Sequence, residues 1–143
     1  MNIDDVIRHK GDTSVVTISP TASVAELVQT LAAKRIGALV VSADGVSIDG
    51  IVSERDVVHG LAARGAAIVD ATVADIMTSD VRTAVPDQSV EETAQSMTVH
   101  RIRHMPIVVE GQMVGLVSIG DVVKHRIDQL TDERDQLIGY LHS

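Results

Sequence analysis

One short pattern occurs twice in the sequence: a glycine, two apolar residues, a serine, two variable residues and an aspartate. The copies run over Gly50–Asp56 and Gly115–Asp121. Each copy follows an apolar run that predicts a strand and begins a predicted helix, so its carboxylate should lie beside a helix N-terminus. A carboxylate there can bond both hydroxyls of a ribose, while the helix N-terminus and a nearby arginine attract a phosphate. Arg55 lies inside the first copy and Gly120 takes its place in the second, so the pattern predicts two unequal sites for a ribose phosphate.

Helix capping is the alternative interpretation of this pattern. A serine followed three residues later by an aspartate is a capping box, in which the serine oxygen accepts a backbone N–H and the carboxylate bonds the backbone N–H of the serine. Capping alone would explain a single copy. Two copies, each after a strand whose glycine permits close backbone approach, favour a binding role.

Other polar patterns give little indication of chemistry. His100 and His104 have the spacing of metal ligands on a helix, but we expect helix to give way to strand between them, so their side chains should diverge and no metal site is predicted. The sequence contains no Walker loop, His-Glu-x-x-His or Gly-x-Ser-x-Gly motif, and no nucleophile lies beside an evident base. We therefore expect no catalytic residues, and a small nucleotide hydrolase is the least favoured function.

The composition disfavours several classes of ligand. The chain of 143 residues has no cysteine, tryptophan or phenylalanine and a single tyrosine. Disulfides and thiolate metal sites are thereby excluded, and ligands that stack on aromatic faces, such as single-stranded nucleic acid, are disfavoured. The formal net charge of −8 also disfavours binding to a nucleic-acid backbone. Because no apolar run could cross a bilayer and the first residues do not resemble a signal peptide, we expect a cytoplasmic protein without membrane association.

The motif is part of an internal repeat, which determines the predicted fold. Residues 17–24 align with 83–90 at an offset of 66, and residues 50–58 align with 115–123 at an offset of 65. Each copy predicts a strand, a helix that follows a capping serine, a hairpin of two strands and a second helix. In the first copy these are the strand 15–18, the helix after Ser23, the hairpin strands 38–41 and 48–52, and the helix near Ser53, with a short opening helix over 4–9. In the second they are the strand 81–84, the helix after Ser89, the hairpin strands 105–109 and 113–117, and the helix near Ser118, with a short opening helix over 73–77.

A unit of about 60 residues is marginally stable alone, so the two copies should pack together through their sheets. We predict an α/β (α+β) fold of two pseudo-symmetric strand-helix-strand-strand-helix repeats. The first domain spans residues 1–66, the second spans 67–143, and the linker falls within 61–71. This symmetry predicts two equivalent clefts.

The last predicted helix continues past the repeat. Its apolar positions alternate spacings of four and three residues, as in a coiled coil, with one basic interruption at Arg134. These positions are Val123, Ile127, Leu130, Leu137 and Leu141. Because this stripe has no obvious partner within one small domain, we predict a homodimer formed through residues 123–142.

The duplicated unit with its repeated glycine-to-aspartate motif resembles a tandem pair of cystathionine-β-synthase (CBS) domains, called a Bateman module, over essentially the whole chain. The strings Val-Ser-Glu-Arg-Asp-Val-Val from Val52 and Val-Ser-Ile-Gly-Asp-Val-Val from Val117 are similar to stand-alone CBS pairs, as is the segment 101–108. The resemblance implies that adenosine nucleotides, namely AMP, ADP, ATP or NAD(H), bind in clefts between the repeats.

The resemblance also implies roles for individual residues. The ribose-binding residues would be Asp56, Asp121, Ser53 and Ser118, and the phosphate-binding residues would be Arg55, Arg103 and Lys10. The adenine pocket would be formed by Thr17, Ile18, Ile36, Gly37, Ala38, Thr83, Ala84, His104, Met105 and Pro106. The first copy has Gly37 and Ala38 where the second has Arg103 and His104, so different ligands are expected in the two clefts, including a dinucleotide that spans more than one pocket.

We predict a non-catalytic nucleotide sensor, in which the ligand changes how the halves, the dimer or a partner protein pack. The alternative is a structural interaction module that docks a partner enzyme without nucleotide control. The net charge is −2 over residues 1–66 and −6 over residues 67–143, which is compatible with a basic partner for the second half.

Overall fold

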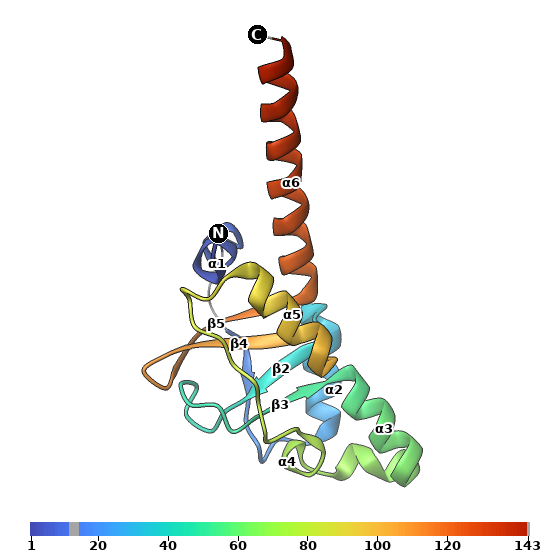
Figure 1. Ribbon diagram of the computed structural model, residues 1–143. Helices are drawn as coiled ribbons and strands as arrows, with labels where there is room; N and C mark the ends of the chain where they lie inside the picture. Colours follow the sequence, from blue (N-terminus) through green and yellow to red (C-terminus); the bar gives the residue numbers. More distant parts are fainter. Residues whose placement is uncertain (12–14, 143) are drawn as a thin grey trace.

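The computed structural model describes residues 1–11 and 15–142, and Figure 1 shows the arrangement of their elements. The helices are α1 (Ile3–His9), α2 (Val24–Lys34), α3 (Glu54–Arg64), the 3-10 helix η1 (Gly65–Asp70), α4 (Val73–Ile76), α5 (Val90–His100) and α6 (Ile119–His142). The strands are β1 (Thr17–Ile18), β2 (Ala38–Val41), β3 (Gly50–Ser53), β4 (His104–Val109) and β5 (Gln112–Ser118). The mixed helix and strand fold and its duplicated order agree with the prediction.

The strands form one small sheet in each half. In the first, β1 pairs with β2 in parallel and β2 pairs with β3 antiparallel. In the second, β4 and β5 form the predicted antiparallel hairpin, whose turn has positive φ at both Glu110 and Gly111. Both predicted hairpins are therefore confirmed, and the second has the backbone of a type I′ turn.

The predicted strand over residues 81–84 does not form. Only Ala84 pairs there, in a single parallel bridge to Ile107. Ala84 donates its backbone N–H to the Pro106 carbonyl, and Val108 donates to the Ala84 carbonyl. The next ladder bonds on either side would require an N–H at Pro86 or Pro106, and proline has none. In the first half Val40 takes the place of Pro106, and the strand there is two residues long.

Matching local signals begin and end the equivalent helices α2 and α5. Ser23 Oγ accepts the backbone N–H of Glu26 at 3.1 Å, and Ser89 Oγ accepts that of Glu92 at 3.0 Å. Each helix then ends at an arginine in the left-handed conformation, Arg35 with φ 53° and Arg101 with φ 54°. These turns direct the chain from a helix into β2 or β4. Each of them also lines a cleft.

The short helices α1 and α4 each pack against the other half of the chain: α1 against the second half and α4 against the first. Ile3, Val6 and Ile7 of α1 are buried in the core of the second half, whereas Val73 of α4 is buried in the core of the first. Equivalent backbone contacts hold both: Ile3 donates to the Gln88 carbonyl at 2.9 Å and Val73 donates to the Ala22 carbonyl at 2.8 Å. The N-terminal helix therefore completes the second repeat.

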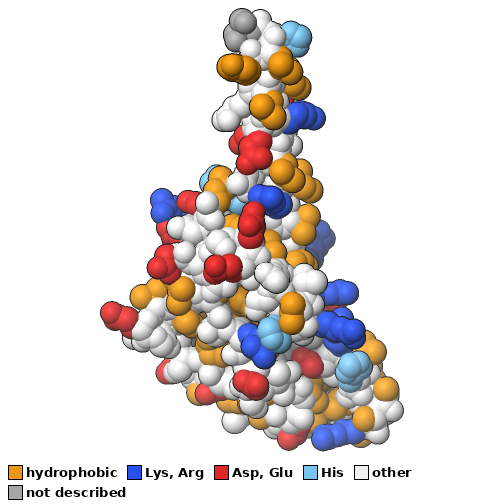
Figure 2. Space-filling view, in the orientation of Figure 1, with side chains coloured by type: hydrophobic (Ala, Val, Ile, Leu, Met, Phe, Trp, Pro, Cys, Tyr) orange, Lys and Arg blue, Asp and Glu red, His pale blue; other side chains and the backbone are white. Residues whose placement is uncertain are grey.

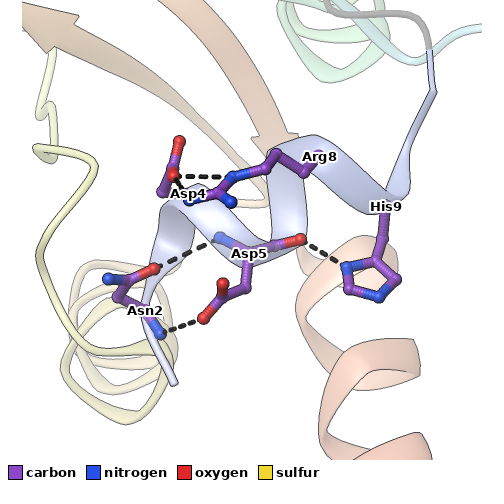
Figure 3. A network of polar contacts seen from close by, with 5 residues as sticks. All are labelled: Asn2, Asp4, Asp5, Arg8 and His9. Atoms are coloured by element: carbon purple, nitrogen blue, oxygen red, sulfur yellow. Dashed lines mark hydrogen bonds and ion pairs between the residues drawn. The ribbon is translucent and has the colours of Figure 1, made fainter.

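The polar contacts of α1 stabilise a helix of only seven residues (Figure 3). Asn2 and Asp5 form a reciprocal capping box, with N···O distances of 3.1 and 3.2 Å. Arg8 pairs with Asp4 one turn away, and His9 Nδ1 lies 2.6 Å from the Asp5 carbonyl oxygen. The helix ends at Lys10, whose side chain reaches a cleft.

The predicted linker is largely helical, and the last helix continues past the repeat as predicted. Residues 61–70 belong to the end of α3 and to η1, whose Ile68 is buried. Helix α6 buries only Val122 and His125, and its remaining length projects from the body (Figure 1). Hydrophobic side chains remain visible along that projecting part (Figure 2). Within the described residues, no helix combines the length and apolar character needed to cross a membrane.

Candidate functional site

Two clefts combine the repeated motif of one half with the helix-to-strand turn of the other. The first, here called the Asp56 cleft, has a volume of about 500 Å³. It is lined by Gly37, Ala38, Ile51, Ser53, Glu54, Arg55, Asp56, Thr78, Asp80, Val81, Arg82, His100, Arg101, Ile102, Arg103 and His104. The second, the Asp121 cleft, has a volume of about 410 Å³. It is lined by Ile7, Lys10, Val15, Val16, Arg35, Ile36, Gly37, Ala38, His104, Gly115, Leu116, Ser118 and Asp121.

Both motif aspartates cap the helices that they begin. Asp56 Oδ2 accepts the backbone N–H of Ser53 at 2.8 Å, and Asp121 Oδ2 accepts that of Ser118 at 2.9 Å. The capping interpretation is therefore correct for this conformation. It does not exclude binding, because both aspartates also line a cleft and every one of these bonds uses the same carboxylate oxygen. Within residues 1–11 and 15–142, Oδ1 of either aspartate accepts no hydrogen bond and can receive one from a ligand.

In the Asp121 cleft, the motif carboxylate also forms an ion pair with a lysine. Lys10 Nζ donates to Asp121 Oδ2 at 2.8 Å and to the Leu116 carbonyl at 2.9 Å. Burial raises the pKa of the Asp121 carboxyl, but the hydrogen bonds from Lys10 and from the Ser118 backbone outweigh it, so the pKa lies below its ordinary value of 3.8. Lys10, a predicted phosphate-binding residue, thus reaches the Asp121 cleft, although in this conformation it neutralises the aspartate.

The Asp56 cleft is rich in arginine. The predicted phosphate residues Arg55 and Arg103 both line it. Arg82 and Arg101 join them there, and sequence reasoning missed both, as it missed Arg35 in the other cleft. The repeat held a signal for two of these, because Arg35 and Arg101 occupy equivalent positions at the helix ends.

His104 and Gly37 lie between the two clefts and contribute to both. A Cβ placed on Gly37 would lie 3.5 Å from His104 Cε1, so little space separates these residues. Burial lowers the pKa of His104 below its ordinary value of 6.5, and the charges of Lys10 and Arg103 add to this effect. Asp121 and Glu54 act in the opposite direction. The imidazole therefore connects the electrostatics of the two sites.

The predicted adenine pocket is only partly assembled at the clefts. Ile36, Gly37, Ala38 and His104 line them as predicted. The other predicted residues do not: Ile18, Ala84 and Met105 are buried in the two cores, and Thr17, Thr83 and Pro106 also lie outside the lining. Val15, Val16 and Val81 line the clefts instead, about two positions earlier in the chain. The segments that precede β1 and Ala84 face the clefts, whereas Ile18 and Ala84 turn into the cores.

The part of the chain that the structure describes contains no group of three or more histidine and carboxylate side chains placed to hold a metal ion. His100 and His104 both line the Asp56 cleft, but His100 ends α5 and His104 begins β4, as the sequence predicted.

Comparison with known proteins gives a consistent family. The family model for the CBS domain matches residues 3–63 and 73–128. The CBS domain-containing protein YhcV of Bacillus subtilis is 30% identical over 127 residues, covering 89% of this chain and 87% of YhcV. The mitochondrial CBS domain-containing protein CBSX3 of Arabidopsis thaliana is 39% identical over 56 residues, which are 39% of this chain and only 27% of that protein.

Solved structures of CBS-domain proteins have the same fold. The structure of ATU1752 from Agrobacterium tumefaciens has a TM-score of 0.83 and 40% identity, with 87% of this chain and 92% of that chain covered. The structure of NE2398 has a TM-score of 0.83 and 34% identity, with 89% and 98% covered. Two matched segments, two motif aspartates and two clefts between the halves lead to one conclusion: the chain belongs to the CBS-domain family, as a tandem pair of CBS domains.

Proposed function

We propose that this protein is a non-catalytic sensor that binds adenosine nucleotides in its two clefts. The observation that carries the proposal is the placement of both motif aspartates: each lines a cleft, and Oδ2 caps a helix while Oδ1 accepts no hydrogen bond from the described residues. A carboxylate oxygen in this position accepts a hydrogen bond from a ribose hydroxyl, and a bond to a charged acceptor contributes about 1.5–3 kcal/mol. Volumes of about 500 and 410 Å³ fall in the range of small-molecule sites.

A related fold supports the class of ligand. The CBS domain pair of protein MJ0100 was solved in complex with 5′-methylthioadenosine and S-adenosyl-L-methionine, both of which contain adenosine. Its structure has a TM-score of 0.79 and 23% identity, with 90% of this chain and 98% of that chain covered. AMP, ADP, ATP and NAD(H) share the adenosine unit and are the candidates for this chain.

A sensor also needs an output that depends on the ligand. Each cleft is walled by both halves, so a ligand that prefers one arrangement of the halves shifts the population toward it. The homodimer predicted through α6 is the proposed receiver of this change, because the exposed stripe of that helix lies on the same element as Asp121.

The proposal is tested by calorimetric titration of nucleotide-free protein with adenosine, AMP, ADP, ATP and NAD(H). Asp56→Asn and Asp121→Asn should each weaken binding by roughly ten- to a hundredfold, or about 1.4–2.8 kcal/mol. Asp75→Asn is the matched control, because Asp75 forms the same capping bond with the Thr72 N–H but lines neither cleft. Absent binding to the whole panel, or equal losses in all three variants, would contradict the proposal.

The second candidate function is a nucleotide-independent docking module. The projecting, partly apolar part of α6 favours it, as does the greater acidity of the second half. Under this alternative a partner protein is captured equally well with and without nucleotide, and substitutions in the clefts leave capture unchanged.

A further inference from the structure

The Asp56 cleft gathers arginines from three separate segments. Arg55 lies in the first turn of α3, Arg82 in the segment after α4, and Arg101 and Arg103 between α5 and β4. Figure 2 shows basic and histidine side chains collected where the end of α5 approaches α3. Arg55 belongs to the first half and the other three arginines to the second, so the set exists only when the halves are packed together.

Among the described residues, none of these four guanidinium groups forms a hydrogen bond or an ion pair with a protein group. The ion pairs of the described chain involve Arg8, Lys10, Arg126 and Arg134 instead. The acidic residues of the lining, Glu54, Asp56 and Asp80, therefore leave the arginine forks open. Like charges around one cavity repel each other, and a multiply charged anion would relieve that repulsion.

The Asp121 cleft differs from its counterpart in this respect. Its lysine is already bonded to Asp121, which leaves Arg35 as the one unpaired Lys or Arg among its described lining residues. Gly37 and Ala38 stand where the other half has Arg103 and His104. The two clefts thus offer four open guanidinium groups against one.

From this contrast we infer that the Asp56 cleft selects its nucleotide by the number of phosphates and takes a nucleoside di- or triphosphate, whereas the Asp121 cleft takes an adenosine ligand with at most one phosphate. This inference rests on the proposed function, since it assigns a ligand class to each of the same sites. Asp56 would hold the ribose, and the arginines from the other segments would contact the phosphate chain.

The test is a titration series with adenosine, AMP, ADP and ATP in EDTA, in the Asp121→Asn background that leaves mainly the Asp56 cleft. Affinity should rise by roughly three- to tenfold with each added phosphate. The rise should shrink between about 50 and 300 mM salt, because the contacts are exposed. Arg101→Gln combined with Arg103→Gln should weaken ATP binding by roughly ten- to a hundredfold and adenosine binding by less than about threefold.

Matched controls separate the cleft from general charge. Arg64→Gln removes a cation from the exposed end of α3, outside both clefts. It should leave the ATP series unchanged. Inorganic triphosphate should compete with ATP. Such competition would show that the rise in affinity comes from the phosphate chain.

The failures of the two proposals are distinguishable. Equal affinities for adenosine, AMP, ADP and ATP, all reduced by Asp56→Asn, would overturn the inference and leave the proposed function intact. Equal weakening of ATP by Arg64→Gln and by the cleft double variant would also overturn it. Binding of inorganic triphosphate without binding of any adenosine compound would support the arginine site and contradict the proposed function.

Discussion

Lys10 Nζ lies 2.8 Å from Asp121 Oδ2, across 111 positions of sequence. This contact joins the end of α1 to the start of α6. It pairs a lysine with a carboxylate that is predicted to bind a ribose. The side chains are 35% and 27% exposed, so the pair is neither fully solvated nor fully buried.

The first prediction concerns acid stability. The folded-state pKa of Asp121 is depressed, so the stability it contributes is present above its ordinary value of 3.8 and is lost as the pH falls through the lower folded-state value. Lys10→Met should cost about 0.5–1 kcal/mol near neutral pH. It should also reduce the loss of unfolding free energy below about pH 4, because the carboxyl loses the hydrogen bond that depresses its pKa.

Urea unfolding at a series of pH values checks this prediction. Lys34→Met is the control, since it removes an exposed lysine at the end of α2 that lines neither cleft. Superimposable pH profiles for the wild type and Lys10→Met would show that the ion pair contributes nothing to acid stability.

The second prediction uses the two motif glycines, which have different neighbours. A Cβ at Gly50 would lie 2.7 Å from Met77 Sδ and 2.8 Å from the Thr78 carbonyl oxygen. At Gly115 the nearest atom would be Ile7 Cδ1 at 3.1 Å, the end of a flexible side chain. Gly50→Ala should therefore destabilise the protein by about 1–3 kcal/mol, and Gly115→Ala by clearly less. Thermal or urea unfolding of the pair measures the difference, and a greater loss for Gly115→Ala would reject this account.

Local signals made much of the fold predictable. The capping serines Ser23 and Ser89, the Glu110-Gly111 turn and the duplicated motif act within a few residues, and the elements they predicted are present. The sequence predicted a full strand over residues 81–84, but only Ala84 pairs. Pro106 shortens this pairing because it has no N–H, and the sequence alone does not show that Pro106 lies opposite this segment.

The site was less predictable, because it is assembled by packing between the halves. The motif gave Asp56 and Arg55, which are adjacent in sequence and share a cleft. Arg82 and Arg101 reach the same cleft from the second half, and sequence spacing does not reveal that approach. Similarly, the predicted adenine-pocket residues Ile18, Ala84 and Met105 proved to be core residues, because neighbouring positions of an extended chain face opposite sides.

The third prediction concerns His104, which is coupled to the charges of both clefts. Its pKa is depressed, mainly by burial, so the folded protein resists protonation and loses stability as the pH falls below about 6.5, where the unfolded chain takes up the proton. An anion beside Arg103 adds negative charge near the imidazole and should raise its pKa. ATP binding near pH 6 should then be accompanied by proton uptake.

Calorimetry in buffers of different ionisation enthalpy measures that proton uptake. His104→Gln should abolish most of it, whereas His59→Gln, on an exposed position of α3 outside both clefts, should leave it unchanged. An ATP-binding enthalpy that does not vary with the buffer would contradict the coupling.

The fourth prediction concerns the projecting part of α6. Residues 126–142 contribute no buried side chain, yet Ile127, Leu130, Leu137 and Leu141 are between 48% and 78% exposed along one seam. An isolated helix of this length is marginal in water, so a partner surface is needed to stabilise it. Because the seam has coiled-coil spacing, a second copy of the same helix supplies a matching surface.

Leu130→Glu combined with Leu137→Glu should convert a dimer to a monomer in light scattering at about 100 µM, and should lower the helical circular dichroism signal as the freed segment frays. Gln129→Glu combined with Gln136→Glu introduces the same two charges outside the seam and should leave the dimer intact. Arg134→Leu should tighten the dimer, because it replaces a charged seam residue with an apolar one. A wild-type protein that is monomeric at this concentration, or a dimer that survives the double variant, would show that the seam does not join two copies.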